Sequence, residues 1–288
     1  METLVRAANA LLMIALPLVL GAVLARRYRL GWGLFGIGAA TFLLSQVLHL
    51  PFNAWVLTPW MERLGLWGVA TGMPLVLMGI LFGLSAGVFE EGARAVVYRT
   101  WLRRARTWPE ALLFGAGHGG IEAIVLGGLS LYGLLQALAL DGVDLATVVP
   151  AEQVEAAQAQ LQAYWGMPWH LAILGAVERV FALCLHLSLT VLVLQAFRRR
   201  NALWWVGAVG WHALVDAGAV VAAVAWGPYL AEGIVGLMAL ASLGIVFKLR
   251  GGDVPDVPAK VEAAPPPVQP TPPAGERKER LDESRYVE

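Results

Sequence analysis

The sequence predicts an all-α membrane protein, a polytopic bundle of about seven transmembrane helices, and two observations carry that prediction. First, hydrophobic residues make up 58% of the chain, charged residues only 15%, and the mean hydropathy is +0.64. A soluble domain of this length carries about a quarter charged residues. Second, the basic residues gather in clusters after alternate apolar segments instead of being spread along the chain. Together these features place most of the chain inside a bilayer.

Seven apolar segments are long enough to cross a bilayer as helices. In chain order they lie near residues 4–25, 31–50, 68–92, 109–138, 169–197, 202–225 and 228–248. We expect the third to continue as a helix towards Arg104. The first ends in Arg26 and Arg27 rather than beginning with positive charge. Because this is the reverse of a signal peptide, we expect the segment to be retained as a span.

Basic clusters follow the first, third, fifth and seventh segments, and the other connections are nearly free of Lys and Arg. The positive-inside rule therefore predicts an N-terminus outside and a C-terminus inside. The chain carries 21 basic and 21 acidic residues and no basic, aromatic stripe, so we expect no nucleic-acid partner. A single cysteine, Cys184, excludes an intrachain disulfide.

Two segments outside the spans have recognisable compositions. The outer connection 141–168 contains a polar, alanine-rich run from Glu152 to Tyr164 that favours helix by propensity. Residues 251–288 hold half of the prolines together with mixed charges, and they cannot build an apolar core. We therefore expect a transmembrane domain over residues 1–250, with its motifs in 68–225, and a disordered, Pro-rich cytoplasmic tail over 251–288.

One charged cluster lies deep in an apolar segment. Glu90, Glu91 and Arg94 follow the uncharged run 68–89. Ionised groups at membrane depth are costly unless they are paired, neutralised or wetted by a cavity. Two adjacent carboxylates also repel one another. Arg94 lies four residues after Glu90, a spacing at which helical side chains can pair, so we expect Arg94 to keep one of the two carboxylates ionised. The cluster predicts a functional site over the alternative of an inert, self-neutralised helix lock.

A stripe of small residues leads into this acidic pair. Gly79, Gly83 and Gly87 recur every four residues, and the same helical face continues to Glu91. Small residues at this spacing let helices approach closely in lipid. The stripe therefore predicts that the acidic pair is seated against a neighbouring helix.

Three later spans carry polar groups at helical spacing. They are His118 with Glu122, Glu178-Arg179 with His186, and His212 with Asp216. Each of the three histidines lies about ten to twelve residues from a basic cluster, which is about 15–18 Å at roughly 1.5 Å per residue. The acidic pair of the third span can lie at a similar depth. We therefore expect four spans to converge on one polar centre near the middle of the membrane.

Each polar group also has a structural interpretation. A histidine in a membrane span often serves as a packing donor between helices, and we assign that role to His49 and His170, which lie at span ends. Glu178 and Arg179 can simply neutralise one another. In the fourth and sixth spans, by contrast, we expect the carboxylate four residues on to orient the imidazole.

Three of these motifs, in this order on successive spans, resemble those of the CAAX-protease and bacteriocin-processing superfamily of intramembrane proteases. The superfamily motifs are a paired Glu followed by a basic residue, Phe-x-x-x-His, and His-x-x-x-Asn/Asp. Their counterparts are Glu90-Glu91 with Arg94, Phe114 with His118, and His212 with Asp216.

The segment 117–122 and the polar residues of the fifth span are most similar to the YhfC-like branch of this superfamily. Arg94 follows the acidic pair after two residues, where the enzymes that process prenylated proteins have three. This spacing is closer to the PrsW-like relatives. The resemblance implies an intramembrane protease, an integral protein of the cytoplasmic membrane of a prokaryote. The resemblance also implies that its substrates are membrane proteins or peptides within the lipid bilayer.

The resemblance implies hydrolysis of a peptide bond, and the residues permit two forms of it. In the first, Glu90 or Glu91 is the general base for a water, His118 polarises that water and His212 donates to the oxyanion. Arg94, Glu122, Arg179, His186 and Asp216 support these groups. In the second, His118, His186 and His212 hold zinc as a metalloprotease cofactor, because three protein ligands and a water are the usual catalytic pattern. No His-Glu-x-x-His motif occurs, which favours the metal-free form and leaves zinc open.

Other classes of function fit the same composition. A proton-coupled transporter or channel also lines up buried Glu, His, Asp and Arg, although clustering at one depth disfavours a path across the bilayer. A haem protein needs axial histidines on facing helices, which these spans can supply. A catalytically inactive membrane scaffold also stays open.

Overall fold

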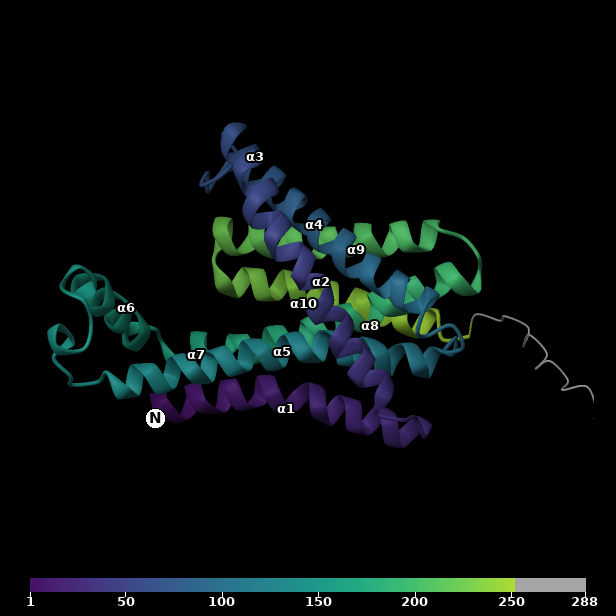
Figure 1. Ribbon diagram of the computed structural model, residues 1–288, viewed down its shortest axis with the longest axis horizontal. Helices are drawn as coiled ribbons and strands as arrows, with labels where there is room; N and C mark the ends of the chain where they lie inside the picture. Colours follow the sequence, from purple (N-terminus) through teal and green to yellow (C-terminus); the bar gives the residue numbers. More distant parts are fainter. Residues whose placement is uncertain (252–288) are drawn as a thin grey trace, which may run out of the picture. The chain divides into compact units, whose positions relative to one another are not determined.

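The computed structural model describes residues 1–251, and within them the chain is helical, with no strand (Figure 1). The long helices are α1 (Glu2–Tyr28), α2 (Gly33–Phe52), α4 (Gly72–Arg99), α5 (Trp108–Ala139), α8 (Leu174–Arg198), α9 (Leu203–Trp226) and α10 (Pro228–Lys248). The short ones are η1 (Asn53–Leu57), α3 (Thr58–Arg63), η2 (Leu145–Thr147), η3 (Ala151–Gln153), α6 (Val154–Gly166) and α7 (Trp169–Ala172). The expected tail lies outside the described residues.

Seven helices of this part of the chain are long and apolar enough to cross a membrane. Each predicted segment corresponds to one of them, so the seven-span prediction is confirmed. The second span is longer than predicted because α2 passes through the π-helix η1 into α3, and together they cover Gly33–Arg63. The side of the membrane on which each end lies stays a prediction.

Helix α8 is at the centre of the bundle and is the most buried of the seven spans. It packs against α5, α9 and α10, and more lightly against α1 and α4. Around it, α1 lies along α5, α4 lies along α9, and α2 contacts both α5 and α4 (Figure 1). Of the four helices that carry the predicted motifs, α8 therefore adjoins the other three, α4, α5 and α9, and α4 also adjoins α9.

The glycine stripe of α4 faces α9, as the sequence predicts. A Cβ added at Gly83 would lie 2.6 Å from the backbone oxygen of Ala213, and one at Gly87 would lie 2.9 Å from that of Val209. Only a residue without a side chain allows the two backbones to approach this closely. Because His212 adjoins this contact on α9, the stripe brings that histidine against the acidic pair of α4.

Helix α4 ends at Arg99 and does not extend to Arg104 as expected. The backbone N–H groups of Trp101 and Leu102 turn back to the carbonyl of Val97, and Arg106 Nη2 donates to the carbonyl of Tyr98 at 2.8 Å. Capping of the last carbonyls in this way terminates a helix. The next helix, α5, then begins with a capping box between Thr107 and Glu110.

The connection 141–168 contains the expected helix, α6. It is tied to the first span by Arg6, whose guanidinium lies 4.6 Å from the ring centroid of Tyr164 and donates to the carbonyl of Met167 at 2.8 Å. Arg6 is buried although it lies near the end of a span. Pairing with an aromatic ring and a carbonyl accounts for that burial.

Candidate functional site

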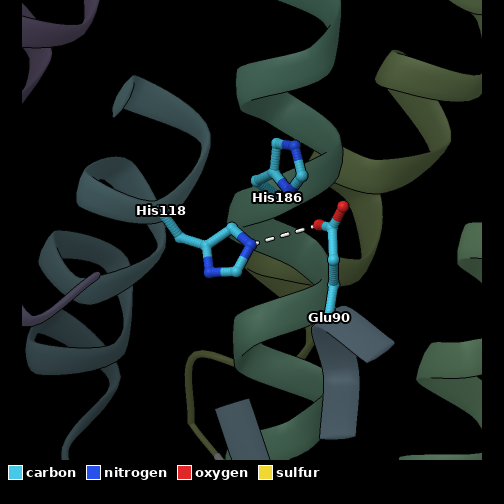
Figure 2. Close-up of side chains that lie close together, drawn as sticks. All are labelled: Glu90, His118 and His186. Atoms are coloured by element: carbon cyan, nitrogen blue, oxygen red, sulfur yellow. Dashed lines mark hydrogen bonds and ion pairs between the residues drawn. The ribbon is translucent and has the colours of Figure 1, made fainter. Parts of the chain in front are cut away.

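Three side chains from three different helices meet at the centre of the bundle. Glu90 of α4, His118 of α5 and His186 of α8 are all buried, and one donor atom from each lies within 4.8 Å of the other two (Figure 2). His118 Nε2 lies 3.1 Å from Glu90 Oε2, and the centroids of the two imidazole rings are 5.3 Å apart. Gly119 makes room for this arrangement, since a Cβ there would lie 2.5 Å from His186 Cδ2. The predicted convergence of spans is confirmed for these three.

The second carboxylate of the pair faces a different set of neighbours. Glu91 is fully buried and accepts from Arg94 and from His212 Nδ1, the latter at 3.0 Å. Of the two carboxylates that Arg94 could pair with, it therefore bonds Glu91 and not Glu90. Residues three and four positions apart both adjoin on a helix, and here Arg94 shares with Glu91 the face towards α8 and α9. Glu90 points instead towards α5 and α2.

Arg94 also joins the acidic pair to α8. Its Nη2 donates to His186 Nδ1 at 2.7 Å, and His186 Nε2 lies 2.8 Å from Glu122 Oε2. The expectation that Glu122 orients His118, four residues earlier on the same helix, is therefore wrong. Helix α8 lies close enough to α5 for Glu122 to reach across to His186, while His118 turns towards Glu90.

The pair Glu178-Arg179 is not isolated. Arg179 donates to Glu178 and to Glu122, each at 2.5 Å, so it connects the expected self-neutralising pair to His186. On α9, His212 Nε2 lies 3.4 Å from Asp216 Oδ2, which bears out the expected pairing of these two residues. His212 is thus flanked by two carboxylates, one at each ring nitrogen.

A cavity of about 130 Å³ adjoins the cluster on the side of α8, α9 and α10. Its polar lining consists of Glu90, Glu122, Glu178, Arg179, His186, His212 and Asp216. Apolar residues such as Val215 and Ala239 complete the wall. Of the adjoining carboxylates Glu90 and Glu91, only the first lines this cavity. The space offers several water molecules polar partners from four helices.

The chemistry of the three donors fits a zinc ion. Zinc is bound by imidazole nitrogen and carboxylate oxygen at about 2.0–2.2 Å, with three protein ligands in catalytic sites. His118 Nδ1 is buried with no hydrogen-bond partner among the described residues, so the ring is hydrogen-bonded there only through the Nε2 that faces Glu90. Arg94 can only donate, so His186 Nδ1 accepts and Nε2 carries the proton shared with Glu122. To hold a metal, this ring must give up one of those two contacts.

This donor group differs by one member from the predicted set of three histidines. Glu90 takes the place of His212, whose ring lies beside His186 with centroids 6.1 Å apart but is bonded to Glu91. The all-histidine set stays a prediction. The side chains predicted for the site form two adjoining hydrogen-bonded groups. One is Glu90 with His118, and it lies beside His186 of the other; the other consists of Glu91, Arg94, Glu122, Arg179, His186, His212 and Asp216.

Sequence reasoning missed the contribution of α2. Gln46 Nε2 lies 3.2 Å from Glu90 Oε1, and Gln46 in turn bonds His49, which the sequence analysis assigned to packing. The signal was present: Gln46, His49 and Asn53 are polar residues three and four positions apart in an apolar span. Polar groups at that spacing share one helical face. His170, the other histidine assigned to packing, lies near Tyr229, with ring centroids 5.9 Å apart.

Comparison with known proteins identifies a family and a relative that resemble this chain. Residues 12–238 match the family described as "YhfC intramembrane metalloprotease". The chain is also 33% identical over 209 residues to the "Uncharacterized membrane protein YhfC" of Bacillus subtilis (strain 168), covering 72% of this chain and 79% of that protein. No solved structure matches the chain.

Proposed function

The chain belongs to the YhfC intramembrane metalloprotease family, and from that premise we propose that it is a zinc-dependent peptidase that cleaves membrane proteins or peptides inside the bilayer. The observation that carries the proposal is the group of Glu90, His118 and His186, whose donor atoms lie within 4.8 Å of one another beside a polar cavity. Two imidazoles and one carboxylate are costly to bury at membrane depth, and groups of this kind within spans usually mark a functional site.

In this proposal Glu90, His118 and His186 hold the zinc ion. When bound, the ion would supply Lewis-acid chemistry, making a nearby water more acidic and polarising the scissile carbonyl. The name of the family and the Glu/His/His donor set both favour the metal-dependent form over the metal-free form that the missing His-Glu-x-x-His motif suggested. In the metal-free form, Glu90 would be the general base, because it is the carboxylate of the pair that lines the cavity.

His212 is the proposed donor to the oxygen that gains charge when the carbonyl is attacked. It lines the cavity, and Glu91 holds Nδ1 at 3.0 Å, so Nε2, which lies 3.4 Å from Asp216, is the nitrogen that would turn from this carboxylate to the substrate oxygen. Donors fixed in advance where charge develops are worth far more in a site that excludes water than in solution. Asp216 orients the ring on the cavity side, and Glu91 orients it from behind.

Arg94 and Arg179 are proposed to support the site without touching the substrate. Arg94 is fully buried and balances the charge of Glu91, so that the second carboxylate of the pair stays ionised. Arg179 balances Glu122 and Glu178 at the other side of His186. Each cation therefore lets a carboxylate hold its place at a depth where an unpaired charge would be costly.

Metal analysis of the purified full-length protein, combined with a cleavage assay, tests the proposal. We expect about one zinc per chain, loss of cleavage on chelation and recovery on adding zinc back. The variants Glu90→Gln, His118→Ala and His186→Ala should each lose bound zinc, and His170→Ala should keep it. Cleavage that persists in the metal-free protein but is lost in Glu90→Gln would replace this proposal with the metal-free form. Cleavage that survives in Glu90→Gln would overturn both.

A further inference from the structure

A row of four polar side chains leads from Glu90 along α2. Gln46 Nε2 lies 3.2 Å from Glu90 Oε1, and Gln46 Oε1 lies 3.1 Å from His49 Nδ1. His49 Nε2 lies 2.9 Å from Asn53 Nδ2, and Ser85 Oγ donates to Asn53 Oδ1 at 2.7 Å. We call Gln46, His49, Asn53 and Ser85 the polar row. It runs from α2 into η1 and returns to α4 at Ser85, one and a half turns before Glu90.

The ionised state of Glu90 determines the direction of every hydrogen bond in the row. A carboxylate only accepts, so Gln46 must present its NH₂ group to Glu90 and its oxygen to His49. His49 Nδ1 must therefore carry the proton, and Nε2 must accept from the NH₂ group of Asn53. The oxygen of Asn53 then accepts from Ser85. All four side chains satisfy this single arrangement, and reversing it would place the oxygen of Gln46 against the carboxylate.

The backbone and the packing hold the row in place. His49 is stacked on Phe89, with ring centroids 5.5 Å apart and planes inclined by 27°, so the imidazole cannot rotate freely. The π-helix Asn53–Leu57 begins at the residue that bonds His49 Nε2. Such π-helical turns are rare in proteins overall, and those that occur are often found at functional sites. His49 and Ser85 are also buried inside the protein.

We propose that Gln46 and His49 are positioning residues that hold Glu90 for metal binding. The row occupies Glu90 Oε1, and this leaves Oε2 directed at His118 and towards His186. The neutral His49 ring, protonated on Nδ1, keeps the amide of Gln46 in the orientation that attracts rather than repels the carboxylate. The proposal rests on the proposed function in one respect, that Glu90 is a zinc ligand. The direction of the row itself does not depend on it.

The experiment measures two quantities, the tautomer of His49 and the affinity of the protein for zinc. In the full-length protein in lipid nanodiscs, with ¹⁵N-labelled histidine, the His49 signal is assigned by its loss in His49→Gln. We expect a neutral ring with the proton on Nδ1. In Asn53→Asp the new carboxylate can only accept, so the proton should move to Nε2. Gln46 would then have to turn its oxygen towards Glu90, and zinc affinity should fall by roughly 10–100-fold, as for other groups that orient a ligand.

Gln46→Met supplies a second variant, which removes the donor without adding a charge. Its zinc affinity should also fall about tenfold or more. Thr41→Val is the matched control: Thr41 is buried on the same helix, but within residues 1–251 its hydroxyl bonds only the carbonyl of Ile37. It should leave both the tautomer and zinc affinity unchanged.

A His49 proton on Nε2 in the unsubstituted protein would overturn the proposal, and so would unchanged zinc affinity in both Asn53→Asp and Gln46→Met. Failure of the proposed function gives a different result. If the protein binds no zinc, the proposed function fails. The His49 tautomers of the wild type and of Asn53→Asp then still test the direction of the hydrogen bonds in the polar row.

Discussion

The two faces of α4 hold adjacent carboxylates in opposite environments. Glu91 lies on the face towards α9, is fully buried, and is bonded to a guanidinium and an imidazole. Glu90 lies on the face towards α5 and α2, lines a cavity, and is bonded to His118 and to the amide of Gln46. No cation of the Arg or Lys type bonds Glu90 within the described residues.

The difference shows how a membrane protein can separate support from chemistry within one helical turn. A carboxylate paired with Arg94 has its charge balanced, and its hydrogen bonds hold neighbouring helices together. A carboxylate held by neutral donors beside a cavity keeps a lone pair for a metal or a water. The same substitution, Glu to Gln, should therefore have different effects at Glu90 and at Glu91, and this can be tested.

The largest expected effect is on the chemistry of the Glu90 face. Glu90→Gln keeps the size of the side chain and removes its charge, so the fold should persist. Zinc binding and cleavage should fall by more than about a hundredfold, because losing a ligand should exceed the roughly 10–100-fold loss from an orienting group. Metal content and rate of peptide cleavage measure this. Glu155→Gln is the control: Glu155 is exposed on α6, outside the spans, and its substitution should change neither quantity.

The next effect is on stability at the Glu91 face. Glu91→Gln leaves Arg94 buried without its anionic partner, and breaking a buried pair costs about 3–5 kcal/mol. Equilibrium unfolding of the purified protein in mixed micelles measures this loss. The double variant Glu91→Gln/Arg94→Gln should recover part of it, because it removes the uncompensated cation. A stable but inactive Glu91→Gln would instead place Glu91 in the chemistry.

The smallest expected effect tests the contact that presents the Glu91 face to α9. In Gly83→Ala, the new Cβ would lie 2.6 Å from the backbone oxygen of Ala213, so the helices must separate. Overpacking of this kind costs about 1–3 kcal/mol, and cleavage should fall as His212 moves away from Glu91. Gly92→Ala is the matched control on the same helix, since nothing lies within 4 Å of its added Cβ. Equal stability of these two variants would contradict the close packing of α4 on α9.

The sequence predicts the spans, and it predicts which polar side chains gather at the candidate site, for local reasons. A span is an apolar run of defined length, so its position follows from composition alone. The depth of His118, His186 and His212 follows from counting residues to the basic clusters, and the glycine stripe of α4 indicates a close helix contact. Span position, residue depth and the glycine stripe all depend on residues that are close together in the chain, so they can be read from the sequence.

The pairing of the side chains was decided only by the tertiary structure. On one helix, Glu90 and Glu91 are equally placed to meet Arg94, and Glu122 is equally placed to meet His118. Packing of α8 and α9 on α4 drew Arg94 to Glu91 and His186, and packing of α8 on α5 drew Glu122 to His186. Likewise, the polar stripe of α2 acquired its partner Glu90 only because α2 crosses α4 at that depth. Intrahelical spacing limits which groups can meet, but a buried charge pairs with whatever partner the helix packing brings within reach.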